Sequence, residues 1–165
     1  METKLNILHY CIYLIHYQVH LLFNKINPFN LLHKLPFQRK KYDELGINIQ
    51  DEINKAFSDR HFGLSIIISG GLVISLIFLV IVSLYQVSFI VLPVNLNFEW
   101  FHFAIFGFLS FSICYFTIFK NDKYLKYFEE FQDWAEPKKK QMVLISLGVV
   151  FLIVLTFFAS LLWID

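Results

Sequence analysis

Three long stretches of the chain are predominantly apolar. They run over residues 64–92, 98–119 and 142–163, and apart from Glu99 at the edge of the second they contain no Asp, Glu, Lys or Arg. About 20 consecutive apolar residues are needed to cross the hydrocarbon core of a bilayer. Because the core offers no water to backbone groups, such segments must be helices that satisfy their own hydrogen bonds. The pattern therefore predicts an all-α integral membrane protein with three transmembrane helices, which together form a transmembrane bundle over residues 64–165.

The N-terminus, residues 1–24, has a different pattern. Polar side chains fall on a single face at about 100° per residue, and apolar side chains fill most of the rest. The polar positions are Asn6, His9, Tyr10, Tyr13, His16, Tyr17, His20 and Asn24. We favour an amphipathic helix that lies in the membrane interface with its polar face toward water. The alternative is a fourth transmembrane helix whose polar face packs against its neighbours.

Two connecting segments are predicted to carry further helices. Residues 25–63 form a basic segment broken by Pro28 and Pro36, with a short helix over 48–60 that begins at the capping residue Asn48. Residues 122–136 read as an amphipathic helix with aromatic residues on one side and charged residues on the other. This helix is expected to lie near the membrane plane with its aromatic side down, or to pack on the N-terminal helix.

Composition and charge add an orientation to this picture. The chain is 57% hydrophobic and 16% charged, against about 45–50% and about 25% in soluble domains. All 14 Lys and Arg residues lie before the first span or between the second and third. Basic loops stay on the cytoplasmic side. The sequence therefore predicts a multi-pass protein of a plasma or inner membrane, with Pro93 and the C-terminus outside.

The basic residues also suggest lipid as a partner. A net charge of +1 gives no footprint for nucleic acid, so none is expected as a partner. Clusters of Lys and Arg beside a bilayer attract anionic lipid. The candidate contacts are Arg39, Lys40, Lys41, Lys138, Lys139 and Lys140.

Small residues in the spans predict close helix packing. Small side chains let membrane helices approach one another, and hydroxyl groups can bond across the contact. The candidate packing or interface residues are Ser65, Ser69, Ser75, Ala104, Gly107, Ser110, Cys114 and Thr117. They can serve packing within the chain or contact with another subunit, and the sequence leaves both open.

Residues with potential chemistry are sparse. His9, His16 and His20 form either a moderately polar helix face or a pH-sensing stripe. His16 and His20 have metal-ligand spacing but no third ligand nearby in sequence, so we predict no metal and no cofactor. No phosphate-binding loop, zinc-protease motif or nucleophile elbow is present in the sequence. We therefore do not expect an enzyme.

These observations favour a non-catalytic integral membrane protein that serves as a structural or accessory subunit of a larger membrane complex. Its expected partners are the lipid bilayer and other membrane protein subunits or further copies of the chain. One alternative is a stand-alone protective or regulatory membrane protein of the toxin-immunity type. Another is a small transporter or a channel-forming oligomer.

Overall fold

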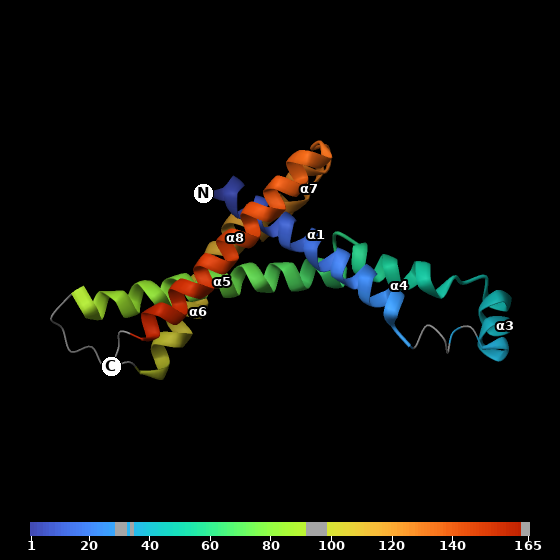
Figure 1. Cartoon of the computed structure of the whole chain (residues 1–165), viewed down its shortest axis with the longest axis horizontal. Coiled ribbons are helices and arrows are strands. Elements are labelled where there is room, and N and C mark those ends of the chain that lie inside the picture. Colours follow the sequence, from blue (N-terminus) through green and yellow to red (C-terminus); the bar gives the residue numbers. More distant parts are fainter. Residues whose placement is uncertain (29–32, 34, 92–98, 163–165) are drawn as a thin grey trace. The chain divides into compact units, whose positions relative to one another are not determined.

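The computed structural model describes residues 1–28, 33, 35–91 and 99–162, and every regular element in these residues is a helix (Figure 1). The helices are α1 (Glu2–Ile26), α3 (Pro36–Leu45), α4 (Ile49–Ser58), α5 (Leu64–Val91), α6 (Trp100–Cys114), α7 (Lys123–Gln132) and α8 (Glu136–Leu161). The chain divides into two compact units: unit 1 comprises Met1–Ile12 and Gly70–Asp165, and unit 2 comprises Tyr13–Ser69. Helices α1 and α5 each contribute residues to both.

Three helical segments are long and apolar enough to cross a membrane, as predicted. They are Leu64–Ser88 within α5, Glu136–Leu161, which is α8, and Trp100–Gln132, which comprises α6, the π-helical turn Tyr115–Phe119 and the helical residues up to the end of α7. Helical structure continues past this turn, but Asn121 and Asp122 have φ angles of 58° and 51° and break the axis. The predicted end of the second span, at residue 119, lies just before this break and stays a prediction. The predicted end residues 92, 98 and 163, with Pro93 and Asp165, lie outside the described residues.

Two helix boundaries between the second and third spans differ from the sequence prediction. Helix α7 ends at Gln132 rather than at residue 136, and α8 already begins at Glu136, ahead of the predicted span start at 142. Pro137 lies in the first turn of α8, where its fixed φ and missing donor suit a helix start. The basic cluster Lys138–Lys140 is therefore part of α8 and not of a loop.

Unit 2 contains the turn that leads into α5. The Asn48 side chain caps α4 by accepting a hydrogen bond from the N–H of Gln50 at 3.2 Å. After α4, the Asp59 carboxylate accepts hydrogen bonds from the N–H groups of Phe62 (2.8 Å) and His61 (2.7 Å), which hold the pKa of Asp59 below its ordinary value. A side chain at Gly63 would collide with the Asp59 carbonyl, so this tight turn requires glycine.

In unit 1, the three spans are joined by side chains within their apolar lengths. Ser160 of α8 donates a hydrogen bond to Gln86 Oε1 of α5 at 2.5 Å, and both side chains are buried. Tyr85 of α5 packs its ring on His102 and Phe106 of α6, with centroids 5.3 Å and 5.0 Å apart. Hydrogen bonds between helices are a common source of association in hydrocarbon.

Candidate functional site

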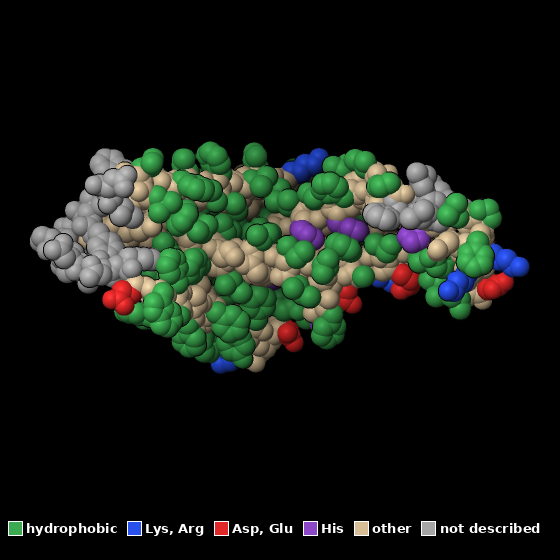
Figure 2. Space-filling view, turned by 90° about the horizontal axis from the view of Figure 1, so that it is seen from below, with side chains coloured by type: hydrophobic (Ala, Val, Ile, Leu, Met, Phe, Trp, Pro, Cys, Tyr) green, Lys and Arg blue, Asp and Glu red, His purple; other side chains and the backbone are tan. Residues whose placement is uncertain are grey.

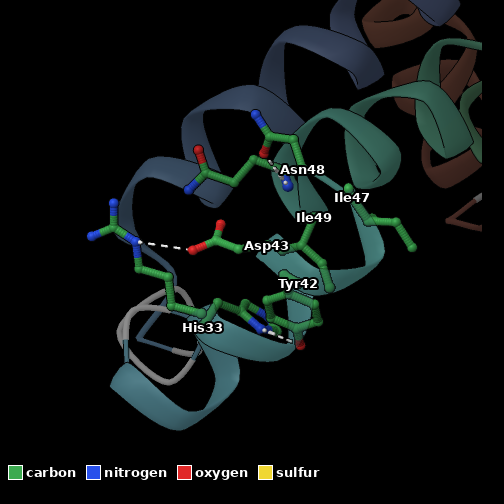
Figure 3. A pocket seen from close by; sticks show the side chains of 9 residues that line it. His33, Tyr42, Asp43, Ile47, Asn48 and Ile49 are labelled. Atoms are coloured by element: carbon green, nitrogen blue, oxygen red, sulfur yellow. Dashed lines mark hydrogen bonds and ion pairs between the residues drawn. The ribbon is translucent and has the colours of Figure 1, made fainter.

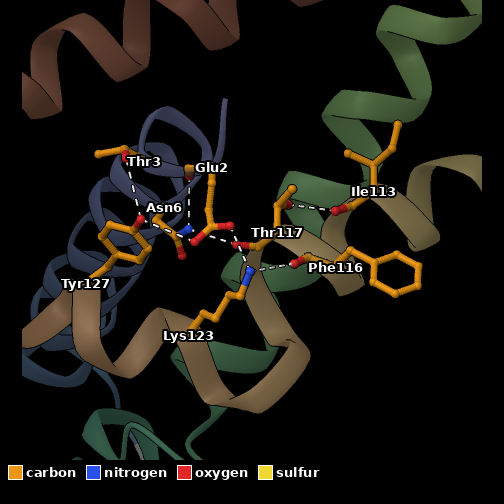
Figure 4. Close-up of polar contacts among 8 residues, drawn as sticks. All are labelled: Glu2, Thr3, Asn6, Ile113, Phe116, Thr117, Lys123 and Tyr127. Carbon is orange, nitrogen blue, oxygen red and sulfur yellow. Dashed lines mark hydrogen bonds and ion pairs between the residues drawn. The ribbon is translucent and has the colours of Figure 1, made fainter.

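The first turns of α1 meet the π-helical turn Tyr115–Phe119 and the start of α7 in a polar cluster, which we call the junction (Figure 4). Its residues are Glu2, Thr3, Asn6, Thr117, Lys123 and Tyr127, all from unit 1. The Lys123 ammonium lies 2.8 Å from Glu2 Oε2, and Tyr127 OH donates to Glu2 Oε1 at 3.3 Å. Residues more than 120 positions apart in the chain are thereby joined by charge-assisted hydrogen bonds.

The junction satisfies backbone carbonyls at the end of the second span. Asn6 Nδ2 donates to the carbonyl of Thr117 at 3.0 Å, and Lys123 Nζ donates to the carbonyl of Phe116 at 3.1 Å. The last carbonyls of a helix have no partner in the next turn and carry partial negative charge. An amide and an ammonium group are therefore well suited to this place. The junction therefore caps the C-terminal end of the helix that finishes at Phe119.

The next turn of α1 packs on aromatic side chains of α7. The His9 ring is fully buried, 5.2 Å from Phe128 and 5.8 Å from both Phe119 and Tyr124. The Tyr10 ring meets Phe128 edge-on at 5.0 Å. Such tilted ring pairs add stability beyond the buried area. Of the two predicted arrangements of α7, this is the one in which its aromatic side packs on the N-terminal helix.

The second half of the polar face of α1 contacts α4 and the start of α5, within unit 2. Tyr13 OH donates to the Ser58 carbonyl at 2.9 Å, and His16 Nδ1 is hydrogen-bonded to Ser65 Oγ at 3.1 Å. The His20 ring stacks on Phe57 with centroids 3.5 Å apart. Burial, helped by the neighbouring His20, lowers the pKa of His16, so protonation is disfavoured there.

The expectation that the polar face of α1 points to water is wrong. Asn6, His9, Tyr10 and Tyr13 are buried against the chain, whereas the apolar side of α1 near its C-terminus is exposed. The periodicity of α1 shows that one face is polar but does not show what that face contacts. The partners come from α4, α7, the π-helical turn Tyr115–Phe119 and the start of α5, and they supply hydrogen bonds or ring contacts to the polar face. Whether the histidines sense pH stays a hypothesis.

The predicted small residues divide into buried and exposed positions. Ser65, Ser69, Ser110 and Cys114 are fully buried, Gly107 and Thr117 are partly buried, and Ser75 and Ala104 are exposed. Sequence reasoning missed the pair Gln86 and Ser160. A glutamine within an apolar span was the available signal, because a polar group in hydrocarbon is costly unless it is paired.

Of the six basic residues proposed as lipid contacts, three contact other side chains of the protein and the other three are exposed. Arg39 lies 3.9 Å from Asp43, Lys139 lies 3.0 Å from Glu136, and Lys138 stands over the Trp134 ring at 4.2 Å. Lys40, Lys41 and Lys140 are exposed. Arg39 and Asp43 both line an open cavity of about 730 Å³ between α3 and the start of α4 (Figure 3). With its guanidinium beside a carboxylate, this cavity has no net charge to select an ion.

The ion pair of the junction gives a testable pH dependence. The hydrogen bond from Lys123 holds the pKa of Glu2 below its ordinary value. Such a carboxylate stabilises the fold above its unfolded pKa, and the stabilisation is lost as the pH falls through the lowered value. We expect the thermal midpoint of the native chain to drop more than that of Glu2→Gln between about pH 6 and about pH 3. Parallel curves for the two chains would contradict this role of Glu2.

The described residues contain no group of three or more His, Cys, Asp or Glu side chains placed to hold a metal ion. The polar contacts of the junction and of the α1–α4 pair are bonds within the protein, and their chemistry is that of helix capping and packing. The sequence matches no protein-family model, no curated protein and no solved structure. The geometry of the chain itself is therefore the basis on which a function can be inferred.

Proposed function

We propose that this chain is a non-catalytic integral membrane protein that acts as a subunit of a larger membrane assembly. Helices α5 and α8, and α6 with its extension to Phe119, would be the spans, with the basic segments in the cytoplasm and the C-terminus outside. The length and hydropathy of these helices support the insertion. The placement of Lys and Arg supports the orientation.

The observation that carries the assembly role is an exposed pair of small residues on α5, Gly71 and Ser75, which we call the notch. Gly71 and Ser75 are one turn apart, and both are exposed. A Cβ atom added at Gly71 would have open space around it. Among the described residues, and leaving out the two chain neighbours and the helix's own backbone, no heavy atom lies within 4 Å of it. The Ser75 hydroxyl donates to the Gly71 carbonyl at 2.9 Å, so its polar group is already satisfied. Small residues one turn apart let a second membrane helix approach closely.

Three further hydroxyl groups of the spans support packing over conduction. Ser83 donates to the Leu79 carbonyl, Ser110 to that of Phe106 and Thr156 to that of Leu152, at 2.7–2.8 Å. Each hydroxyl is bonded to its own helix one turn back. A pore lining needs polar groups directed at the permeating species, and these groups are committed elsewhere.

The test compares two glycine substitutions in the full-length, tagged chain. The chain should first remain in membranes after an alkaline wash. Native electrophoresis in mild detergent should then show it in a complex well above its own 19.6 kDa. Gly71→Leu fills the notch and is expected to weaken the complex at least about tenfold, a loss of about 1.4 kcal/mol. Gly148→Leu is the matched control, because Gly148 is also exposed on a span, α8, with open space around it.

Two results would count against the assembly role. The native chain could migrate as a monomer in several mild detergents, so that there is no complex to weaken. Alternatively, Gly71→Leu and Gly148→Leu could lower complex formation equally, which would show that the effect is not specific to the notch.

A further inference from the structure

Helix α1 buries much of its polar face, and near its C-terminus it exposes large apolar side chains. Its exposed side, which we call the α1 apolar face, consists of Val19, Leu22, Phe23 and Ile26, with exposed fractions of 42%, 58%, 68% and 72%. These positions fall within a sector of about 100°. Exposure of this apolar area to water is unfavourable, and its burial would be stabilising. Figure 2 shows one face of the molecule on which hydrophobic side chains predominate and charged ones are few.

The charges of α1 are placed at its ends. From Leu5 to Asn24 the helix has no Asp, Glu, Lys or Arg, and Lys4 and Lys25 flank this stretch. A long Lys side chain can lie along an apolar surface while its ammonium reaches the headgroups. The α1 apolar face therefore fits a bilayer, whose hydrocarbon accepts the apolar side chains and whose anionic headgroups accept the lysines.

The contacts of α1 with the spans lie at one end of those spans. In unit 1, Asn6 bonds to the Thr117 carbonyl, and His9 packs on Phe119 close to Gly70, where an added methyl group would lie 3.8 Å from His9 Nε2. In unit 2, His16 bonds to Ser65, the second residue of α5. Phe119 ends the second span and Leu64 begins the first, and consecutive spans run in opposite directions, so these ends share one side of the membrane.

A transmembrane α1 would have to pass from this end of the spans to the other. The hydrocarbon core is about 30 Å thick, and the 25 residues of α1 extend about 37 Å. A crossing helix of that length would contact the middle and the far end of its neighbours. In unit 1, the described contacts of α1 lie instead in the last turn of the second span, at Gly70 in the second turn of α5, and in the first half of α8, where Cys11 is hydrogen-bonded to Ser146.

We propose that α1 is an interfacial helix on the side of the basic loops, with its apolar face inserted into the bilayer of its own membrane. Its polar face is covered by α7 in unit 1 and by α4 in unit 2. This inference rests on the proposed membrane insertion of α5, α6 and α8. It makes α1 a lipid-binding element of the protein and not a fourth span.

The test is a set of spin-label depth measurements on the full-length chain in nanodiscs of phosphatidylcholine with a minor fraction of phosphatidylglycerol. Single cysteines replace Val19, Phe23 and Ile26. Cys11 and Cys114 are buried, so the unsubstituted chain taken through the same labelling gives the background. Lys55→Cys on the exposed side of α4 is the water control, and Phe151→Cys on the exposed side of α8 is the deep control. We expect the three α1 labels at a common depth of about 5–10 Å, with Phe151 deeper.

Each other outcome overturns the inference for a different reason. A steady change of about 1.5 Å per residue between positions 19 and 26 would make α1 a fourth span. Water-exposed α1 labels, with the Phe151 label still in lipid, would show that the bilayer does not cover the α1 apolar face. If the Phe151 label were also in water, the membrane insertion under the proposed function would fail as well.

Discussion

Phe128→Ala is expected to lower the free energy of unfolding by about 3–5 kcal/mol. Phe128 is fully buried and packs on the rings of His9, Tyr10 and Tyr124. Truncation removes these contacts and leaves a cavity that two helices joined by rings cannot easily close. A denaturant titration in mild detergent, followed by Trp fluorescence, measures the loss. Trp134 lies 4.4 Å from Phe131 and reports directly on α7.

The matched control is the same substitution at an exposed phenylalanine outside the spans. Phe37 on α3 is 82% exposed, so Phe37→Ala should change the unfolding free energy by no more than about 0.5 kcal/mol. If the two variants were equally stable, the α1–α7 packing would contribute little to the fold, and the junction could not be a rigid part of it.

Asn6→Asp is expected to destabilise the junction by at least about 3 kcal/mol at neutral pH. The Asn6 amide donates to the carbonyls of Glu2 and Thr117, both at 3.0 Å. An aspartate of nearly the same shape would direct a carboxylate oxygen at two carbonyl oxygens in a fully buried place. The pKa of the introduced carboxyl would rise, because only the protonated form can donate, so stability should be regained as the pH falls. Thermal unfolding across a pH series measures both effects.

Asn24→Asp on the same helix is the control for Asn6→Asp. Asn24 is only partly buried and donates to Asn54 at 3.5 Å. The helix dipole favours an acidic residue near the N-terminus of α1 and disfavours it near the C-terminus. If the helix dipole were the only effect, Asn6→Asp would lower stability less than Asn24→Asp. A larger loss at position 24 than at position 6 would therefore refute the capping role of Asn6.

The helical segments of the candidate spans could be predicted because crossing a bilayer requires both a certain length and an apolar composition. Residues 64–92 and 98–119 needed only a predominantly apolar run of sufficient length, and Leu64–Val91 and Trp100–Phe119 are helical. The early start of α8 could have been predicted as well, since Pro137 favours the first turn of a helix. Its neighbouring lysines suggested a loop instead. Asn48 was recognisable because helix capping depends on local sequence.

The candidate site depends on contacts that no local pattern contains. Asn6 shows by its spacing that α1 has a polar face, but its acceptor, the Thr117 carbonyl, lies 111 positions away. Asn121 and Asp122 carry no distinctive signal for two successive positive φ angles, although both residue types tolerate that conformation better than most. The orientation of the polar face of α1 follows from these distant partners, which is why it could not be read from α1 itself.

The distance in sequence between α1 and α7 has a consequence for biosynthesis. Glu2 and Asn6 leave the ribosome long before Lys123 and Thr117, which are 121 and 111 positions later. At about 5–20 residues per second, translation of that interval takes on the order of 5–25 s. During this time the nascent α1 has none of its α7 partners, and only water can hydrate its polar face. The contacts of the junction therefore form only after the second hydrophobic segment has been synthesised. Helix α1 reaches its final position late although it is synthesised first.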